Sequence, residues 1–295
     1  MEYGIKGTRE QANHHLVKSF PPLIPCSLVL LLCLMASCVP LDQLPPGSVP
    51  LVPAGNTGPS AFPDLDPGNT TVTSAHFTIK AYSQTDADTI KQMAETLFNK
   101  IGSDIGLYTF LASQNFSLYV YHDRDEYLKK THEPVWSHAV ASGKALYFYY
   151  PDPGLEPYMA HYLSHLILGN YLGDKARTLK WLDEGLAMNE ELAKMSEGDR
   201  ASYVTSKASQ LRQNRMPFSQ MTFFVTNTEE KRRTDAWYQQ VESVVTYLLA
   251  QGSPLAFAQF LSEVRSVEVD QAISDAYPAK FRSLNDLEAA WKYTI

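Results

Sequence analysis

Two histidines four residues apart stand in a largely apolar stretch, and a second helix-like run follows them. On an α-helix, the spacing of His161 and His165 puts both imidazoles on one face, about 40° apart. Leu163 and Ile167 fall on the opposite side and predict that this side faces a core. The second run begins at Trp181, so this part of the chain is predicted to fold as two helices joined by a short connection.

The second run places a carboxylate 19 residues after His165, at Glu184. Two imidazoles from one helix and a carboxylate from the next make three protein ligands for zinc and leave a fourth position open. Gly185, beside Glu184, permits close approach of another helix. The alternative is that both histidines are merely polar or half-buried, and that Glu184 is solvated on a helix whose core face carries Trp181.

Taken together, the His-x-x-x-His helix and the run Trp-Leu-Asp-Glu-Gly-Leu-Ala (181–187) resemble the peptidase MA-like, gluzincin zinc metallopeptidases. The resemblance covers most of 72–295. It implies a zincin-like metallopeptidase fold and zinc ligation by His161, His165 and Glu184. It also implies that the strand from Leu146 to Tyr150 forms the sheet edge to which an extended peptide adds.

One position departs from the family motif His-Glu-x-x-His, because Tyr162 stands where the glutamate belongs. In the family, that glutamate accepts a proton from the zinc-bound water. A tyrosine has a reference pKa near 10, stays neutral at pH 7 and accepts this proton poorly. General acid–base catalysis typically contributes about 10²–10⁴-fold, so hydrolysis is expected to be impaired. Asp183 and Glu156 are poor substitutes by position, and Tyr203 and Tyr238 are either cleft hydrogen-bond donors or, as we favour, aromatic residues at the edge of the core.

The N-terminal segment predicts export and anchoring. Residues 1–38 combine Lys18, an apolar run from Leu23 to Ser37, and Cys38 directly after small residues, which resembles a bacterial lipoprotein signal with Cys38 as the lipidated residue. A plain cleaved signal peptide or an uncut anchor helix are the alternatives. All three cysteines (Cys26, Cys33 and Cys38) lie in this segment, so no internal disulfide is expected in the domain.

Residues 39–71 are rich in proline and predict a disordered tether, followed by one domain over 72–295. Alternation of apolar residues predicts strands at 72–80, 116–121 and 145–150, and a period of 3.6 predicts helices over 85–101, 122–130 and most of 155–295. The fold class is therefore α+β, with a small mixed sheet lobe (72–154) before a mainly helical lobe (155–295).

These features predict a membrane-anchored protein of the bacterial envelope that binds zinc, hydrolyses peptides poorly and binds a peptide or protein. Val39 after Cys38 favours the outer membrane, facing the periplasm or the cell surface. The net charge of -7 and pI near 5.6 argue against nucleic acid as a partner. Two other functions remain open: an active zinc-dependent endopeptidase with a different base, and a metal-free structural or interaction module.

Overall fold

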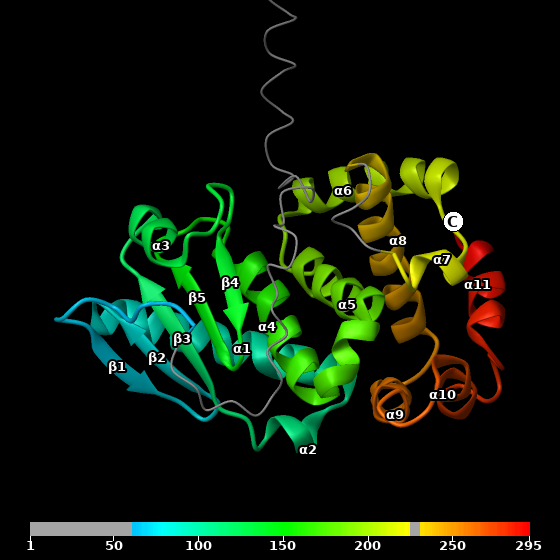
Figure 1. Ribbon diagram of the computed structural model, residues 1–295, viewed down its shortest axis with the longest axis horizontal. Coiled ribbons are helices and arrows are strands. Elements are labelled where there is room, and N and C mark those ends of the chain that lie inside the picture. The colour runs from blue at the N-terminus through cyan, green and yellow to red at the C-terminus, as the bar shows by residue number, and fades with distance from the viewer. Residues whose placement is uncertain (1–60, 225–230) are drawn as a thin grey trace, which may run out of the picture. The chain divides into compact units, whose positions relative to one another are not determined.

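The computed structural model describes residues 61–224 and 231–295 of the chain, and Figure 1 shows a small sheet beside a larger group of helices. The strands are β1 (Thr70–Thr73), β2 (Phe77–Ala81), β3 (Phe116–Tyr121), β4 (Ala139–Ser142) and β5 (Ala145–Tyr149). The helices are α1 (Gln84–Ile105), α2 (Tyr108–Leu111), α3 (Arg124–Thr131), α4 (Leu155–Leu172), α5 (Lys180–Leu192), α6 (Glu197–Asn214), α7 (Phe218–Met221), α8 (Lys231–Ala250), α9 (Pro254–Glu263), α10 (Val269–Ala276) and α11 (Leu284–Lys292). The α+β class is confirmed, with a short 3₁₀ helix, η2 (Gly173–Thr178), between α4 and α5.

The sheet is mixed, with strand order β1-β2-β3-β5-β4. The inner strands β2, β3 and β5 run parallel, and β1 and β4 pair antiparallel at the two edges. The single strand expected over 72–80 is a hairpin, because the chain turns at 74–76. The strand from Leu146 to Tyr150 was expected at the sheet edge, and this was wrong: β5 is covered by β4, which lies outside it.

Strand β4 was not predicted from the sequence, because it is only four residues long and its side chains are mostly small. A two-residue connection joins it to β5. Gly143 in this connection has φ of 59°, a left-handed conformation that glycine adopts without steric cost. Register in the hairpin pairs Val140 with Tyr147 and Ala141 with Leu146.

Apolar and tyrosine side chains alternate along β3 and β5, so the sheet has two buried faces. Leu118 and Leu146 belong to the face packed against α1 and α4, whereas Tyr121 and Tyr147 point to the other face. Helix α3 and the segment 61–66 cover this tyrosine-rich face.

The tether was expected to extend to residue 71, and this boundary was wrong for residues 61–71. Leu65 is buried in the tyrosine cluster, and Phe62 meets the ring of Tyr147 edge-on at 5.0 Å. The Tyr121 hydroxyl donates to the carbonyl oxygen of Pro63 over 2.8 Å. The signal peptide predicted for 1–38, the candidate lipidation residue Cys38 and residues 39–60 of the tether lie outside the described residues.

Helix α4 is the centre of the fold. It packs on the sheet and α1 on one side and on α5 on the other, and α5 in turn packs on α8. The close approach of α5 and α8 depends on Gly185, since a Cβ there would lie 2.5 Å from the carbonyl oxygen of Val241. Twelve of the 18 residues of α4 are buried, which puts both its histidines inside the protein.

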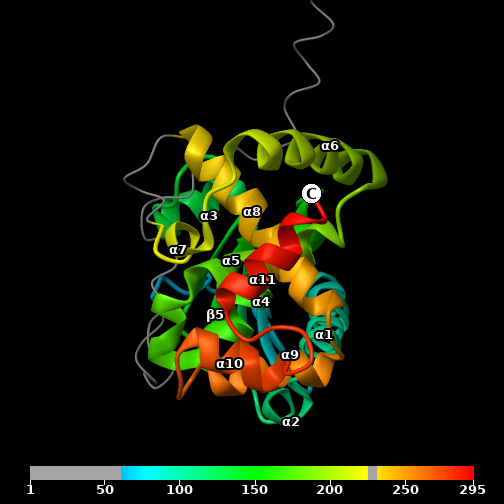
Figure 2. The ribbon, with the colours of Figure 1, turned by 90° about the vertical axis from the view of Figure 1, so that its right-hand side faces the viewer.

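The C-terminal helices close the far side of α8 (Figure 2). The indole of Trp291 on α11 donates to the hydroxyl of Ser243 on α8 over 3.1 Å, and its ring lies 5.3 Å from that of Phe218. Among the described residues, no single helix has the length and apolar composition to cross a membrane, although α8 and α9 meet both criteria as a pair bent by 119°.

Candidate metal site

The three predicted ligands come together in the structure. His161 and His165 project from α4 and Glu184 from α5, and one ligand atom from each lies within 4.8 Å of the others. The two Nε2 atoms are 3.0 Å apart, and Oε2 of Glu184 is 3.7 Å from Nε2 of His165. All three residues are buried. The spacing on one helix and the position on the next therefore predicted the convergence correctly.

Two further carboxylates lie beside the outer nitrogens of the imidazoles. Nδ1 of His165 lies 2.9 Å from Oδ2 of Asp183, within a hydrogen bond. Nδ1 of His161 lies 2.8 Å from Oε2 of Glu191, although the angle is unfavourable for a hydrogen bond. Both rings are thereby turned so that Nε2 faces the space between the ligands. A carboxylate behind a histidine is the usual partner that fixes ring orientation in metal sites.

Sequence analysis missed both of these carboxylates. It considered Asp183 only as a base and rejected it because it points about 100° away from Glu184 around the helix. That angle is what lets Asp183 reach the far nitrogen of His165 while Glu184 faces the near one. The position of Glu191 also carried a signal, because seven residues after Glu184 is almost two full turns and the same helix face.

The residues present fit a divalent cation. When Nδ1–H of His165 is donated to Asp183, its Nε2 carries a lone pair directed at Nε2 of His161. Oε2 of Glu184 is buried with no hydrogen-bond partner among the described residues. The Nε2 lone pairs and the carboxylate of Glu184 share one buried space. A positive charge there stabilises them, because a buried negative charge without compensation costs free energy. Two imidazole nitrogens and one carboxylate oxygen form a donor set that zinc accepts.

In the metal-free chain a proton on His165 supplies this charge. Burial alone lowers the pKa of His165, but the charge and hydrogen bond of Asp183 and the charge of Glu184 outweigh burial and raise the pKa to about 9. A protonated Nε2 donates to Nε2 of His161 over the 3.0 Å between them. The site is therefore built to hold positive charge, either as a proton or as a metal ion.

Tyr162 lies against the ligands. Its ring centroid is 5.2 Å from that of His161 and 6.2 Å from that of His165. Burial, and then the charges of Glu133, Glu191 and Glu184, raise the pKa of Tyr162 above its usual value near 10. The phenol is consequently neutral at physiological pH and offers a hydrogen-bond donor, not a basic carboxylate, at this position.

The other residues that sequence analysis weighed lie in varied surroundings. Glu156, at the start of α4, forms an ion pair with Lys194 over 3.0 Å and has half its side chain exposed. Tyr203 and Tyr238 are buried members of the main hydrophobic core, which agrees with the interpretation that they are packing residues. Glu133, in the loop after α3, was not considered, yet its charge acts on Tyr162 and burial raises its own pKa.

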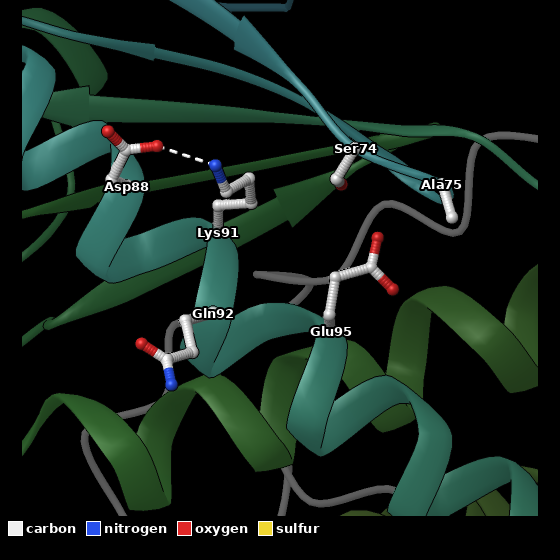
Figure 3. Close-up of a pocket in the computed structure, with 6 residues that line it drawn as sticks. All are labelled: Ser74, Ala75, Asp88, Lys91, Gln92 and Glu95. Carbon is white, nitrogen blue, oxygen red and sulfur yellow. Dashed lines mark hydrogen bonds and ion pairs between the residues drawn. The ribbon is translucent and has the colours of Figure 1, made fainter.

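A separate open hollow lies between the β1–β2 turn and α1 (Figure 3). Three charged residues line it, and all three are paired: Lys91 contacts Asp88 over 2.5 Å, as Figure 3 shows, and Glu95 contacts His76 over 2.7 Å. The hollow shares no residue with the histidine site. The chemistry of the described residues is therefore concentrated on α4 and α5.

Comparison of the chain with protein-family models, with curated proteins and with solved structures found no match. The described side chains are consequently the basis for assigning function. They form a buried His161, His165 and Glu184 group that can hold a metal ion, with carboxylates behind both histidines.

Proposed function

We propose that this chain is a membrane-anchored, zinc-binding protein with a gluzincin-type metallopeptidase scaffold, impaired in hydrolysis, that binds a peptide or protein in the bacterial envelope. The observation that carries the proposal is the convergence of the Nε2 atoms of His161 and His165 on a buried oxygen of Glu184 that has no hydrogen-bond partner within the described ranges. The anchor and the location follow from the lipoprotein-like sequence that ends at Cys38.

Zinc is the metal that best suits two imidazoles and one carboxylate with room for a further ligand. When bound, zinc supplies a Lewis acid that polarises a carbonyl group and lowers the pKa of water to about 7. Asp183 holds the imidazole of His165 in the ligating orientation, and Glu191 lies 2.8 Å from the outer nitrogen of His161.

Impaired hydrolysis follows from Tyr162. Its raised pKa keeps the phenol protonated, so it can donate a hydrogen bond but does not take up a proton at neutral pH. The loss of a general base typically lowers the rate by about 10²–10⁴-fold. A protein that keeps the metal ligands but lacks the general base is better suited to binding a peptide than to cleaving it.

The partner in this proposal is a peptide or protein. Strand β4 takes the edge position that the resemblance gave to the strand from Leu146 to Tyr150, and helix α4, which carries both histidines, packs against it. All four residues of β4 are at most 9% exposed, so the outer side of β4 is not the surface assigned to the partner.

The decisive measurement is the zinc content of the purified full-length chain, determined by elemental analysis beside two variants. We expect about one zinc per chain, lost in His161→Ala because two ligands no longer hold the ion. His122→Ala is the matched control: this histidine is largely exposed, lies outside the ligand group and should leave the zinc content unchanged. Absence of zinc from the wild-type chain, even after metal loading, would contradict the proposal and favour the metal-free module.

A second candidate is an active endopeptidase, and Glu133 is the observation that favours it. This half-buried carboxylate acts electrostatically on Tyr162 and offers a base that the helix itself lacks. Cleavage of a broad peptide library that is sensitive to chelator and lost in His161→Ala would identify this function. No cleavage by the wild-type chain, together with gain of cleavage in Tyr162→Glu, would identify the impaired enzyme.

A further inference from the structure

The three candidate ligands are shielded from solvent. His165 is 2% exposed, Glu184 5% and His161 6%. Oε2 of Glu184 lies 3.7 Å from Nε2 of His165; this oxygen is itself buried and has no hydrogen-bond partner within the described ranges. The atoms that would hold a metal therefore face an enclosed space.

The spacing of these atoms already suits one ion. The two Nε2 atoms lie 3.0 Å apart, and Oε2 of Glu184 lies 3.7 Å from Nε2 of His165. Two ligands of a tetrahedral zinc ion, with bonds of about 2.0–2.1 Å, are separated by about 3.3–3.4 Å. The hydrogen bond to Asp183 fixes the ring of His165. An ion in this space therefore joins α4 to α5 at a separation that the metal-free chain already has.

Tyr162 lies beside the histidine face of α4. Its ring centroid is 5.2 Å from that of His161 and 6.2 Å from that of His165. The residue is 9% exposed and belongs to the main hydrophobic core. A tyrosine ring is larger than a carboxylate side chain and apolar over most of its surface. It therefore fills space next to the ligands and excludes water from it.

The segment between α3 and β4 covers the same side of α4. Tyr158, one turn before Tyr162, stacks on the ring of His138 with centroids 4.2 Å apart. Burial, and then the charge of Glu133, raise the pKa of Tyr162, which agrees with a place of Glu133 near the phenol. Helix α5 packs on α4 and supplies Glu184. The ligand group is thus enclosed by two helices and the loop 132–138.

We propose that the ring of Tyr162 seals this site, so that a bound zinc ion is a structural cross-link between α4 and α5 and takes no ligand from solvent. The inference rests on the proposed function, which supplies the zinc. A water enclosed with the ion can complete its coordination. Sealing adds a second obstacle to hydrolysis beside the absent carboxylate base, because a substrate carbonyl does not reach the ion. The peptide or protein partner then binds away from the metal, on a domain that the metal stabilises.

Cobalt(II) reports whether a ligand from solvent reaches the site, because it accepts the ligands of zinc and its visible spectrum changes when a further ligand binds. The full-length chain and its variants are loaded with cobalt and titrated with acetohydroxamic acid, a small chelating ligand. Tyr162→Ala removes the ring, whereas Tyr162→Phe removes only the hydroxyl. Tyr203→Ala is the matched control: Tyr203 is a core tyrosine on α6, 6% exposed and outside the ligand group.

We expect acetohydroxamic acid to leave the cobalt spectra of wild type, Tyr162→Phe and Tyr203→Ala unchanged, and to change that of Tyr162→Ala with saturation. Release of cobalt to excess EDTA should be about 10- to 100-fold faster from Tyr162→Ala than from the other three chains, the usual effect of altering the surroundings of a metal. Zinc at about 100 times its Kd should raise the thermal unfolding midpoint of wild type by about 5–10 °C. His161→Ala should show no such rise.

A wild-type spectrum that changes with acetohydroxamic acid overturns the inference and leaves zinc binding intact, and this arm of the experiment needs no substitution. A change in Tyr162→Phe or Tyr203→Ala, or none in Tyr162→Ala, would show that the ring of Tyr162 is not the seal. Equal unfolding midpoints for the zinc-loaded and zinc-free chain would overturn the cross-link. A wild-type chain that takes up neither cobalt nor zinc contradicts the proposed function itself.

Discussion

The charge of His165 depends mainly on Asp183 on the neighbouring helix. In the metal-free chain, their hydrogen bond of 2.9 Å keeps a proton on an imidazole whose burial would otherwise expel it. The same bond directs Nε2 toward Glu184 and His161, so orientation and charge have one cause. Substitution of this carboxylate by an amide of the same shape separates the two effects.

The stability of the metal-free chain is predicted to fall with rising pH. The pKa of His165 is about 9 when folded, against 6.5 for an unperturbed histidine, so the folded state binds the proton more tightly. This contribution is fully present below pH 6.5 and is lost as the pH rises through 9. In Asp183→Asn the pKa drops and the decline should flatten.

Urea unfolding of chelator-treated chain between pH 7.5 and 9.5 tests this prediction. Burial and the charge of Asp104 raise the pKa of Glu190 to about 7, and the chosen window lies above that titration. Equal slopes of unfolding free energy against pH in wild type and Asp183→Asn would show that His165 does not hold the proton.

At the scale of elements, the site depends on three helices in contact. Helix α4 carries two of the candidate ligands and α5 the third, and α8 packs against α5. Gly185 lies at the contact of α5 and α8, next to the ligand Glu184. Displacement of α5 by a few tenths of an ångström at this point alters both the packing and the ligand geometry.

Gly185→Ala is predicted to destabilise the chain by about 1–3 kcal/mol, the usual cost of overpacking a core. The new Cβ would lie 2.5 Å from both the Val241 carbonyl oxygen and Cγ2 of Val245, so one helix must move. Gly198→Ala on α6 is the matched control, because its Cβ meets nothing closer than 4.0 Å and helix propensity favours alanine. Denaturant unfolding followed by circular dichroism measures both, and a Gly185→Ala chain as stable as Gly198→Ala would refute the close contact.

At the scale of the whole molecule, the folded part extends upstream of the first strand. The segment 61–66 lies on the tyrosine-rich face of the sheet, anchored by Leu65 and Phe62. Lys80 and Lys130 contact its acidic residues, Lys80 through Asp64 and Lys130 through Asp66 over 2.9 Å. The sheet is consequently covered on both faces, as a sheet with parallel inner strands requires.

Leu65→Ala in the full-length chain is predicted to lower the free energy of unfolding by about 2 kcal/mol, at the low end for buried leucines because the site is near the surface. Leu65 is 6% exposed, whereas the control Leu255→Ala removes a leucine that is 68% exposed and should change stability by less than about 0.5 kcal/mol. The thermal unfolding midpoint distinguishes the two variants. Equal midpoints would show that 61–66 does not contribute to the fold.

The sequence by itself determined the features that depend on local periodicity. The amphipathic pattern of α1, the alternation in β3 and the mainly helical course of 155–295 were all predicted, although α7 was missed, because each depends on residues three, four or two apart. The convergence of His161, His165 and Glu184 was predictable for the same reason, since two ligands share one helix turn and the third lies on the next helix.

Only the tertiary structure decided the features that depend on pairing between distant segments. The edge position of β4 rests on its pairing with β5, and the packing of 61–66 rests on tyrosines that come more than fifty residues later. The carboxylates behind the histidines belong to this class as well, because Asp183 and Glu191 reach α4 only once α5 packs against it. Periodicity defines which face of an element is buried, whereas the partner of that face is fixed by the packing of the whole chain.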